Sequence, residues 1–174
     1  RLRVMESPLF TRVKQTRVVS RIPILDVVRQ YPRNILLAMG ARFAENACFY
    51  SFSVFVLSFA TEQPGLQKQS VLTGVWIAAA VQLVAIPAFG LLSDRVGRRP
   101  VYLCGAFFIA VFAFPFFWLV ETQSVILVWL AIVIGLVGHA AMYGPQAEFF
   151  SELFGTNVRY SGASIGSQLA SQFA

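Results

Sequence analysis

Charged side chains are scarce in this sequence. Of its 174 residues, 13% are charged and 57% are hydrophobic, whereas a water-soluble domain usually carries about 25% charge. The shortage excludes most soluble folds, and the 17 phenylalanines exclude a disordered chain. A membrane protein remains, and the lengths of the apolar runs test that interpretation.

Cysteine is also nearly absent. Cys48 and Cys104 both lie inside apolar runs without metal-ligand spacing, so we expect packing roles, no disulfide framework and no metal site. The sequence has no HExxH motif and no pair of aspartates in an apolar run. These absences argue against a membrane-embedded enzyme, and we expect neither catalytic residues nor a cofactor.

Positive charge is concentrated at the start of the chain. The first 33 residues hold eight Lys and Arg against two acids, so they carry the whole net charge of +6 and the remainder is neutral. A basic segment directly before an apolar run is typical of a cytoplasmic flank on the inner leaflet, so we expect no nucleic-acid partner. Residues 20–33 have apolar side chains at near-helical spacing and predict a short amphipathic helix on that leaflet. An ordered cytosolic linker is the alternative.

Apolar runs long enough to cross a lipid bilayer follow one another along the chain. They predict an all-α integral membrane protein, with transmembrane helices at about 34–60, 71–92, 101–120 and 125–148 and a fifth that starts within 161–174. Lys and Arg favour the flanks before the first, third and fifth of these, which places residues 1–33 in the cytoplasm and the protein in the plasma (inner) membrane. The chain starts without Met and stops within a helical pattern, so we expect a fragment of a longer protein.

The connection between the second and third predicted helices has an unusual composition. It reads Gly90-Leu-Leu-Ser-Asp94-Arg95-Val-Gly97-Arg98-Arg99-Pro100. A glycine in the helix permits close approach of a neighbour, a glycine in the turn permits a positive φ, and an aspartate among arginines has partners at hand. A generic positive-inside loop requires neither the glycines nor the acid.

Gly90, Asp94, Arg95, Gly97, Arg98 and Arg99 match the G-x-x-x-D-R-x-G-R-R signature of the major facilitator superfamily, which the chain therefore resembles. Further stretches resemble the metabolite:proton symporter branch, which includes carriers of proline and betaine, shikimate, 2-oxoglutarate and citrate. They are Arg1-Leu-Arg-Val-Met-Glu-Ser-Pro-Leu-Phe10, Ala41-Arg-Phe-Ala-Glu-Asn46, Met142-Tyr-Gly-Pro-Gln-Ala147, Ser151-Glu-Leu-Phe-Gly155 and Arg159-Tyr-Ser-Gly162.

The resemblance implies a fold, a position within it and an activity. The fold has twelve helices, and residues 34–174 are part of its carboxy-terminal half, because the opening resembles the central loop and the fourth run lacks the buried arginine of an amino-terminal half. By the same resemblance, the signature turn forms part of the cytoplasmic gate. The activity is import of a small organic acid, zwitterion or related metabolite by alternating access, with protons as coupling ion and the amino-terminal half as partner. A structural or channel-type membrane subunit is the alternative.

Arg42 and Glu45 are charged residues inside the first predicted helix. Each costs roughly 2.5 to 3.5 kcal/mol if it faces lipid, so we expect both to face protein or water. Their spacing puts them on one face with Asn46. Either Arg42 attracts an anionic substrate while Glu45 partners it or exchanges a proton, or they form a structural ion pair. The remaining candidates for the substrate or proton site, each of which also fits a helix contact, are Tyr50, Gln82 and His139.

The end of the fourth predicted helix has features of an inner gate. Tyr143-Gly144-Pro145-Gln146 predicts a kink, which is either a hinge or an ordinary bend. The charged residues around the following turn resemble gate contacts, and solvated loop charges are the alternative reading. They are Glu148, Glu152 and Arg159.

Overall fold

The computed structural model describes residues 23–62, 66–155, 161–165 and 168. This part of the chain is helical and contains no strand, which confirms the all-α prediction. Residues 161–165 are helical too, and they are most of what is described of the fifth predicted span. The remaining elements are α2 (Pro23–Gln30), α3 (Pro32–Tyr50), the π-helical segment η1 (Ser51–Phe55), α4 (Val56–Glu62), α5 (Lys68–Val96), α6 (Arg98–Glu121) and α7 (Val125–Glu152).

Three of these helices, α5, α6 and α7, are long and apolar enough to cross a membrane. They contain the second, third and fourth predicted spans; α5 and α6 extend beyond them at both ends, and α7 extends beyond its span at the carboxy-terminal end alone. The first predicted span is divided among α3, η1 and α4. In η1 the Ser53 hydroxyl donates to the carbonyl of Phe49 at 2.6 Å, four residues back. Serine bonds of this kind bend helices, and π-turns commonly mark functional sites.

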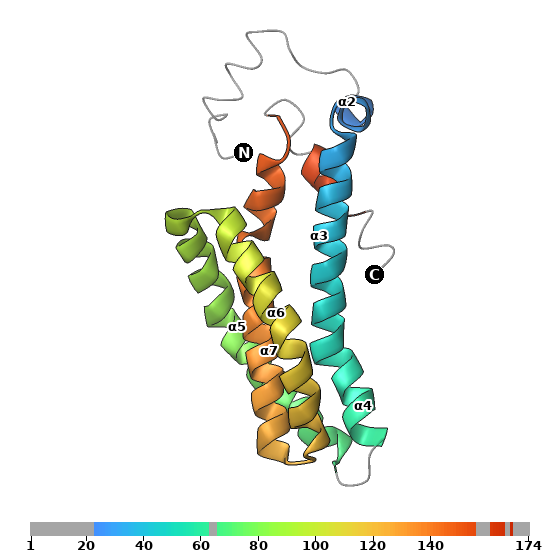
Figure 1. The fold of residues 1–174 in the computed structure, drawn as a ribbon, viewed down its shortest axis with the longest axis vertical. Helices are drawn as coiled ribbons and strands as arrows, with labels where there is room; N and C mark the ends of the chain where they lie inside the picture. The colour runs from blue at the N-terminus through green and yellow to red at the C-terminus, as the bar shows by residue number, and fades with distance from the viewer. Residues whose placement is uncertain (1–22, 63–65, 156–160, 166–167, 169–174) are drawn as a thin grey trace, which may run out of the picture.

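Helix α7 is the central element of the fold (Figure 1). It packs extensively against both α5 and α6, and α3 lies against it with fewer contacts. Small residues on α7 allow these contacts: the ring of Phe52 lies on Gly135, and the ring of Phe108 lies on Gly138. The Phe52 ring also meets Phe116 edge-on, with centroids 4.7 Å apart. The core therefore joins α6, α7 and η1 through aromatic rings seated on glycines.

The basic flanks of the described chain gather at one end of the molecule. There Gly97 separates α5 from α6 with a φ of 106°, the positive value expected for this turn. Arg98 beside it forms ion pairs with Glu148 and Glu152 near the end of α7. Helix α2 lies at the same end of the molecule (Figure 1). This arrangement is the one that the charge pattern predicts.

Helix α2 forms within the predicted amphipathic segment and begins at Pro23, as expected for proline in a first turn. Val27 is fully buried, in a small cluster with Ile35 of α3 and Phe154 beyond α7. The helix is therefore anchored to the bundle. Its position on the inner leaflet stays a prediction, and residues 1–22 lie outside the described part of the chain.

Candidate functional site

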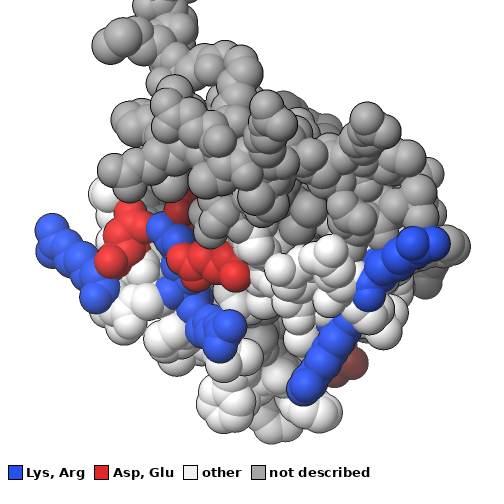
Figure 2. Space-filling model, turned by 90° about the horizontal axis from the view of Figure 1, so that it is seen from above, with Lys and Arg blue, Asp and Glu red and all other residues white. Residues whose placement is uncertain are grey.

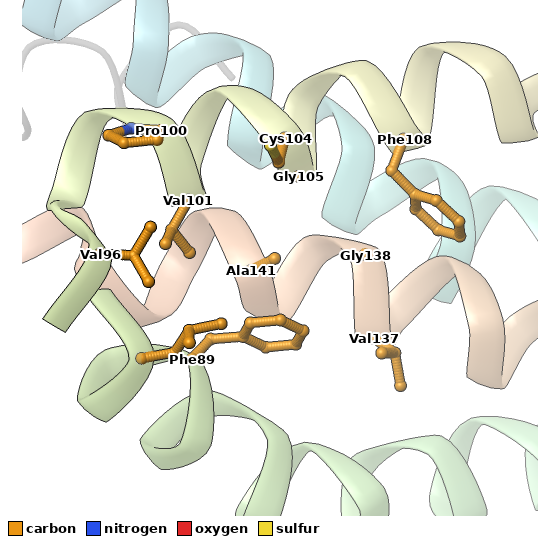
Figure 3. Close-up of a pocket in the computed structure, with 11 residues that line it drawn as sticks. Phe89, Val96, Pro100, Val101, Cys104, Gly105, Phe108, Val137, Gly138 and Ala141 are labelled. Carbon is orange, nitrogen blue, oxygen red and sulfur yellow. The ribbon is translucent and has the colours of Figure 1, made fainter. Parts of the chain in front are cut away.

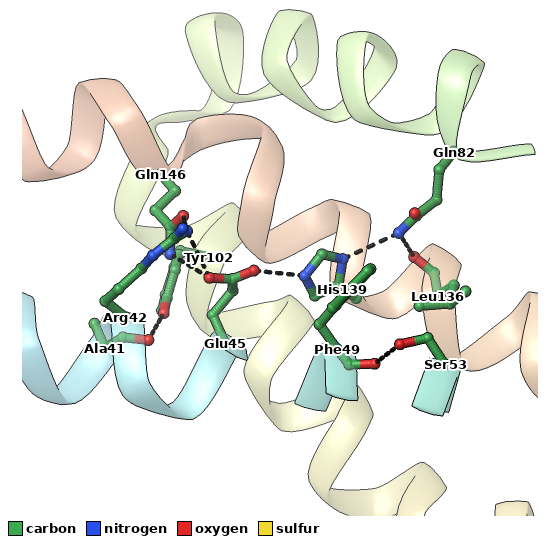
Figure 4. A network of polar contacts seen from close by, with 10 residues as sticks. All are labelled: Ala41, Arg42, Glu45, Phe49, Ser53, Gln82, Tyr102, Leu136, His139 and Gln146. Atoms are coloured by element: carbon green, nitrogen blue, oxygen red, sulfur yellow. Dashed lines mark hydrogen bonds and ion pairs between the residues drawn. The ribbon is translucent and has the colours of Figure 1, made fainter. Parts of the chain in front are cut away.

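Five polar side chains meet inside the bundle, where α3, α5 and α7 face one another (Figure 4). We call this group the buried polar cluster. His139 and Gln146 share a face of α7 because they are seven residues, about two helical turns, apart. The cluster consists of Arg42 and Glu45 from α3, Gln82 from α5, and His139 and Gln146 from α7.

The Glu45 carboxylate is the centre of the cluster and is 2% exposed. Its Oε1 lies 2.6 Å from Nε2 of His139. Its Oε2 accepts from Nη1 of Arg42 at 2.7 Å and from Nε2 of Gln146 at 3.3 Å. A buried carboxylate is costly unless it is paired and hydrogen-bonded. These contacts give both carboxylate oxygens of Glu45 a polar partner.

The hydrogen bonds of Gln82 define the tautomer of His139. The Gln82 Nε2 atom lies 3.0 Å from the carbonyl oxygen of Leu136 and 3.0 Å from Nδ1 of His139. A carbonyl only accepts, so the amide nitrogen faces it, and Nδ1 must then accept the second amide proton. The imidazole proton is on Nε2 and points at Glu45. His139 is thus neutral here, and the charges of Arg42 and Glu45 cancel.

Arg42 has hydrogen-bonding capacity to spare. Its Nη1 donates to Oε1 of Gln146 at 2.7 Å, and its Cζ lies 6.0 Å from the ring centroid of Tyr143. Its Nε is buried without a hydrogen-bond partner among the described residues. Arg42 also lines two cavities, of about 340 Å³ and 640 Å³. A solute in either cavity therefore lies beside the Arg42 side chain.

The structure brings the candidates for the substrate or proton site together. Arg42, Glu45, Asn46, Tyr50, Gln82 and His139 all line the 340 Å³ cavity. Tyr143, predicted at the inner gate, lines it as well, and Gln146, another gate candidate, bonds to Arg42 and Glu45. Pro145 between them is buried, and α7 continues through it to Glu152.

Two further contributors were not singled out from the sequence. The ring of Phe49 lies against His139, with centroids 5.2 Å apart. The Tyr102 hydroxyl donates to the carbonyl of Ala41 at 2.7 Å and ties α6 to α3 beside Arg42. The spacing of His139, Tyr143 and Gln146 places them on one face of a helix, and this pattern could have grouped them from the sequence. No sequence pattern pointed to the contact of Tyr102 with Ala41.

The signature turn is joined to α7 through one arginine. Arg98 contacts Asp94 at the end of α5, with Nη2 and Oδ1 3.4 Å apart. It also forms ion pairs with Glu148 and Glu152 of α7. We call this set the Arg98 clamp. Acidic and basic side chains lie side by side on this end of the molecule (Figure 2). Arg159, the remaining gate candidate, lies outside the described residues.

We predict that Arg98→Ala loosens this end of the bundle. Three carboxylates then repel one another without a cation among them, so the melting temperature of the purified full-length protein should fall in low salt. The fall should shrink at high ionic strength, because exposed charges are screened. Arg99→Ala is the control, since Arg99 forms no ion pair with the described residues. Equal melting temperatures of the two variants at low salt contradict the clamp.

The family model described as Major Facilitator Superfamily matches residues 6–174. The chain is 33% identical over 158 residues to the shikimate transporter of Escherichia coli (strain K12), an alignment that covers 90% of the chain and 36% of that protein. Identity to the inner membrane metabolite transport protein YhjE of the same strain is 31% over 176 residues, covering 98% of the chain and 40% of that protein.

The proline/betaine transporter of the same strain is 27% identical over 144 residues, which cover 81% of the chain and 28% of that protein. The chain thus spans less than half the length of these curated relatives. No solved structure gives a significant match to the chain.

Proposed function

The chain belongs to the Major Facilitator Superfamily, and from that premise we propose that the full-length protein imports a small organic acid or zwitterion by proton symport. Its relatives are transporters of metabolites and osmolytes, not enzymes. The observation that carries the proposal is the buried polar cluster, in which a cation, an acid and an imidazole share one cavity wall. A carboxylate is the substrate group that fits it.

The charge balance of the cluster supports an order of binding. While Glu45 is ionised it neutralises Arg42, and a second carboxylate in the cavity meets no net positive charge. When Glu45 takes a proton, the guanidinium is released and pairs with the substrate carboxylate instead. The site then holds a proton and an anion together, whereas an anion alone leaves two carboxylates to compete for Arg42.

Translocation follows by alternating access of the cluster to the two sides of the inner membrane. Residues 34–174 act as part of the carboxy-terminal half, which rocks against an amino-terminal half elsewhere in the full-length protein. The Arg98 clamp tightens the cytoplasmic end while the cavity opens outward. Proton release from Glu45 to the cytoplasm restores the pair with Arg42 and expels the substrate. The relative YhjE is named an inner membrane protein, which supports this location.

Substitution of Arg42 tests the proposal. We expect Arg42→Gln to lower the uptake rate of the reconstituted full-length protein at subsaturating substrate by about 10- to 100-fold, because a charge-assisted hydrogen bond contributes about 1.5 to 3 kcal/mol. Arg42→Lys should give an intermediate loss, since lysine keeps the charge without the planar fork. Labelled organic acids and betaines at two pH values serve as substrates.

Arg33→Gln is the matched control, because Arg33 is an exposed arginine at the start of the same helix and lines neither cavity. Protein level and melting temperature are measured for every variant. Uptake by Arg42→Gln at the control rate contradicts a substrate role for Arg42. The absence of any proton-dependent uptake by the full-length protein would favour the alternative, a structural or channel-type subunit.

A further inference from the structure

A second cavity, separate from the buried polar cluster, lies between α5 and α6 with α7 as its floor (Figure 3). Its volume is about 480 Å³, and every residue that lines it is apolar. Representative lining residues are Phe89, Leu92 and Val96 of α5, Cys104 and Phe108 of α6, and Ala141 of α7. We call this cavity the apolar cleft.

The apolar cleft lies among the three helices that are able to span the membrane. Water is a poor occupant, since a stable buried water needs two to four polar partners and this lining offers none. An empty cleft is also unfavourable, because its walls lose dispersion contacts. Hydrocarbon satisfies both conditions, and the bilayer supplies it as acyl chains.

One end of the apolar cleft lies next to two arginines that form no ion pair with the described residues. Val96 and Pro100 form this end in Figure 3, and they directly follow Arg95 and Arg99 in the sequence. Both arginines are exposed, and neither forms an ion pair or hydrogen bond with the described residues. Arg98 between them is already engaged by three carboxylates. No described side chain therefore occupies these two guanidiniums, and an external anion can pair with them.

We propose that the apolar cleft and these two arginines form a binding site for an anionic phospholipid. One acyl chain fills the cleft and the phosphate pairs with Arg95 and Arg99. Guanidinium binds phosphate strongly, and basic residues at a cytoplasmic helix end favour anionic headgroups. The positive amine of a zwitterionic headgroup offsets part of that attraction, so phosphatidylglycerol should bind more tightly than phosphatidylcholine. The proposal does not depend on what the protein transports.

Lipid binding to the purified full-length protein tests the headgroup half of the site. Native mass spectrometry counts the phosphatidylglycerol and phosphatidylcholine molecules retained from mixed micelles. The double variant Arg95→Gln/Arg99→Gln should bind phosphatidylglycerol about 30-fold more weakly, since each arginine near an anionic surface contributes about fivefold. The double variant Arg29→Gln/Arg33→Gln removes the same charge from two exposed residues that do not border the cleft. Because these two belong to the predicted inner-leaflet flank, it should weaken binding, but clearly less than Arg95→Gln/Arg99→Gln does.

A second pair of variants tests the acyl-chain half. Cys104→Phe places a larger side chain in the cleft and should reduce retention of phosphatidylglycerol, whereas Leu103→Phe, at an exposed neighbour that does not line the cleft, should not. All the residues substituted in these four variants are exposed, so the hydrophobic core stays intact in each variant. Equal retention of the two lipids by the unmodified protein overturns the proposal. So does an equal loss of binding in the two arginine double variants, which would indicate diffuse surface charge.

Discussion

Glu45→Gln should abolish proton-driven accumulation while leaving substrate exchange within a few-fold of normal. Glutamine has the shape of protonated glutamate, so it leaves Arg42 available to a substrate carboxylate. It has no titratable proton, so each transport cycle carries substrate alone. A gradient of one pH unit supplies about 1.4 kcal/mol per proton and drives about tenfold accumulation at a stoichiometry of one. For Glu45→Gln the accumulation ratio should fall to about one.

The measurement uses the full-length protein in proteoliposomes, with an imposed pH gradient for accumulation and equal pH on both sides for exchange. Glu121→Gln is the matched control, since Glu121 is an exposed acid at the end of α6, remote in sequence from the signature turn. Tenfold accumulation by Glu45→Gln would show that the proton binds elsewhere. Loss of exchange in a folded Glu45→Gln protein would assign Glu45 to substrate binding instead.

Local features of the structure were predictable from the sequence alone. The helices α5, α6 and α7 follow from apolar run length, and the positive φ of Gly97 follows from its place in a two-helix turn. The Arg42–Glu45 pair follows from spacing within one helix, where residues three apart share a face. In each case the deciding interaction spans only a few residues.

Features that depend on how helices face one another were not predictable in the same way. Gln146 was expected at the inner gate, and it bonds to Arg42 and Glu45 because α7 turns that face toward α3. The π-helical turn η1 had no clear signature, since its five residues fit a regular helix by composition. A periodic pattern gives the spacing along one helix, whereas the rotation of that helix is determined by packing with residues far away in the chain.

The two glycines at the crossing of α5 and α7 illustrate this limit. The signature singles out Gly90 as the residue that permits close approach. A Cβ on Gly90 would nevertheless lie 3.8 Å from the carbonyl oxygen of Gly144, an ordinary van der Waals contact. A Cβ on Gly144 would lie 2.8 Å from the carbonyl oxygen of Ile86 and 3.0 Å from the amide nitrogen of Gly90. Gly144 is therefore the residue on which this close approach depends.

Gly144→Ala should destabilise the full-length protein, whereas Gly90→Ala should be neutral or mildly stabilising. Alanine is more favourable than glycine within a helix by up to about 1 kcal/mol, and both variants gain this. Only Gly144→Ala adds a clash with backbone atoms, which no side-chain rotation relieves, and overpacking of this kind costs about 1 to 3 kcal/mol. Thermal unfolding of the two purified variants under the same conditions gives the comparison.

The same clash should reach the buried polar cluster. Relief requires α5 to move away from α7 near Ile86, one helical turn from Gln82, whose amide holds the tautomer of His139. We therefore expect Gly144→Ala to impair uptake as well as stability. Both its accumulation ratio and its melting temperature should be lower than those of the unmodified protein. Equal melting temperatures for Gly144→Ala and Gly90→Ala would contradict the assigned crossing. Loss of uptake by Gly90→Ala at an unchanged melting temperature would instead place the role of Gly90 in another state of the transport cycle.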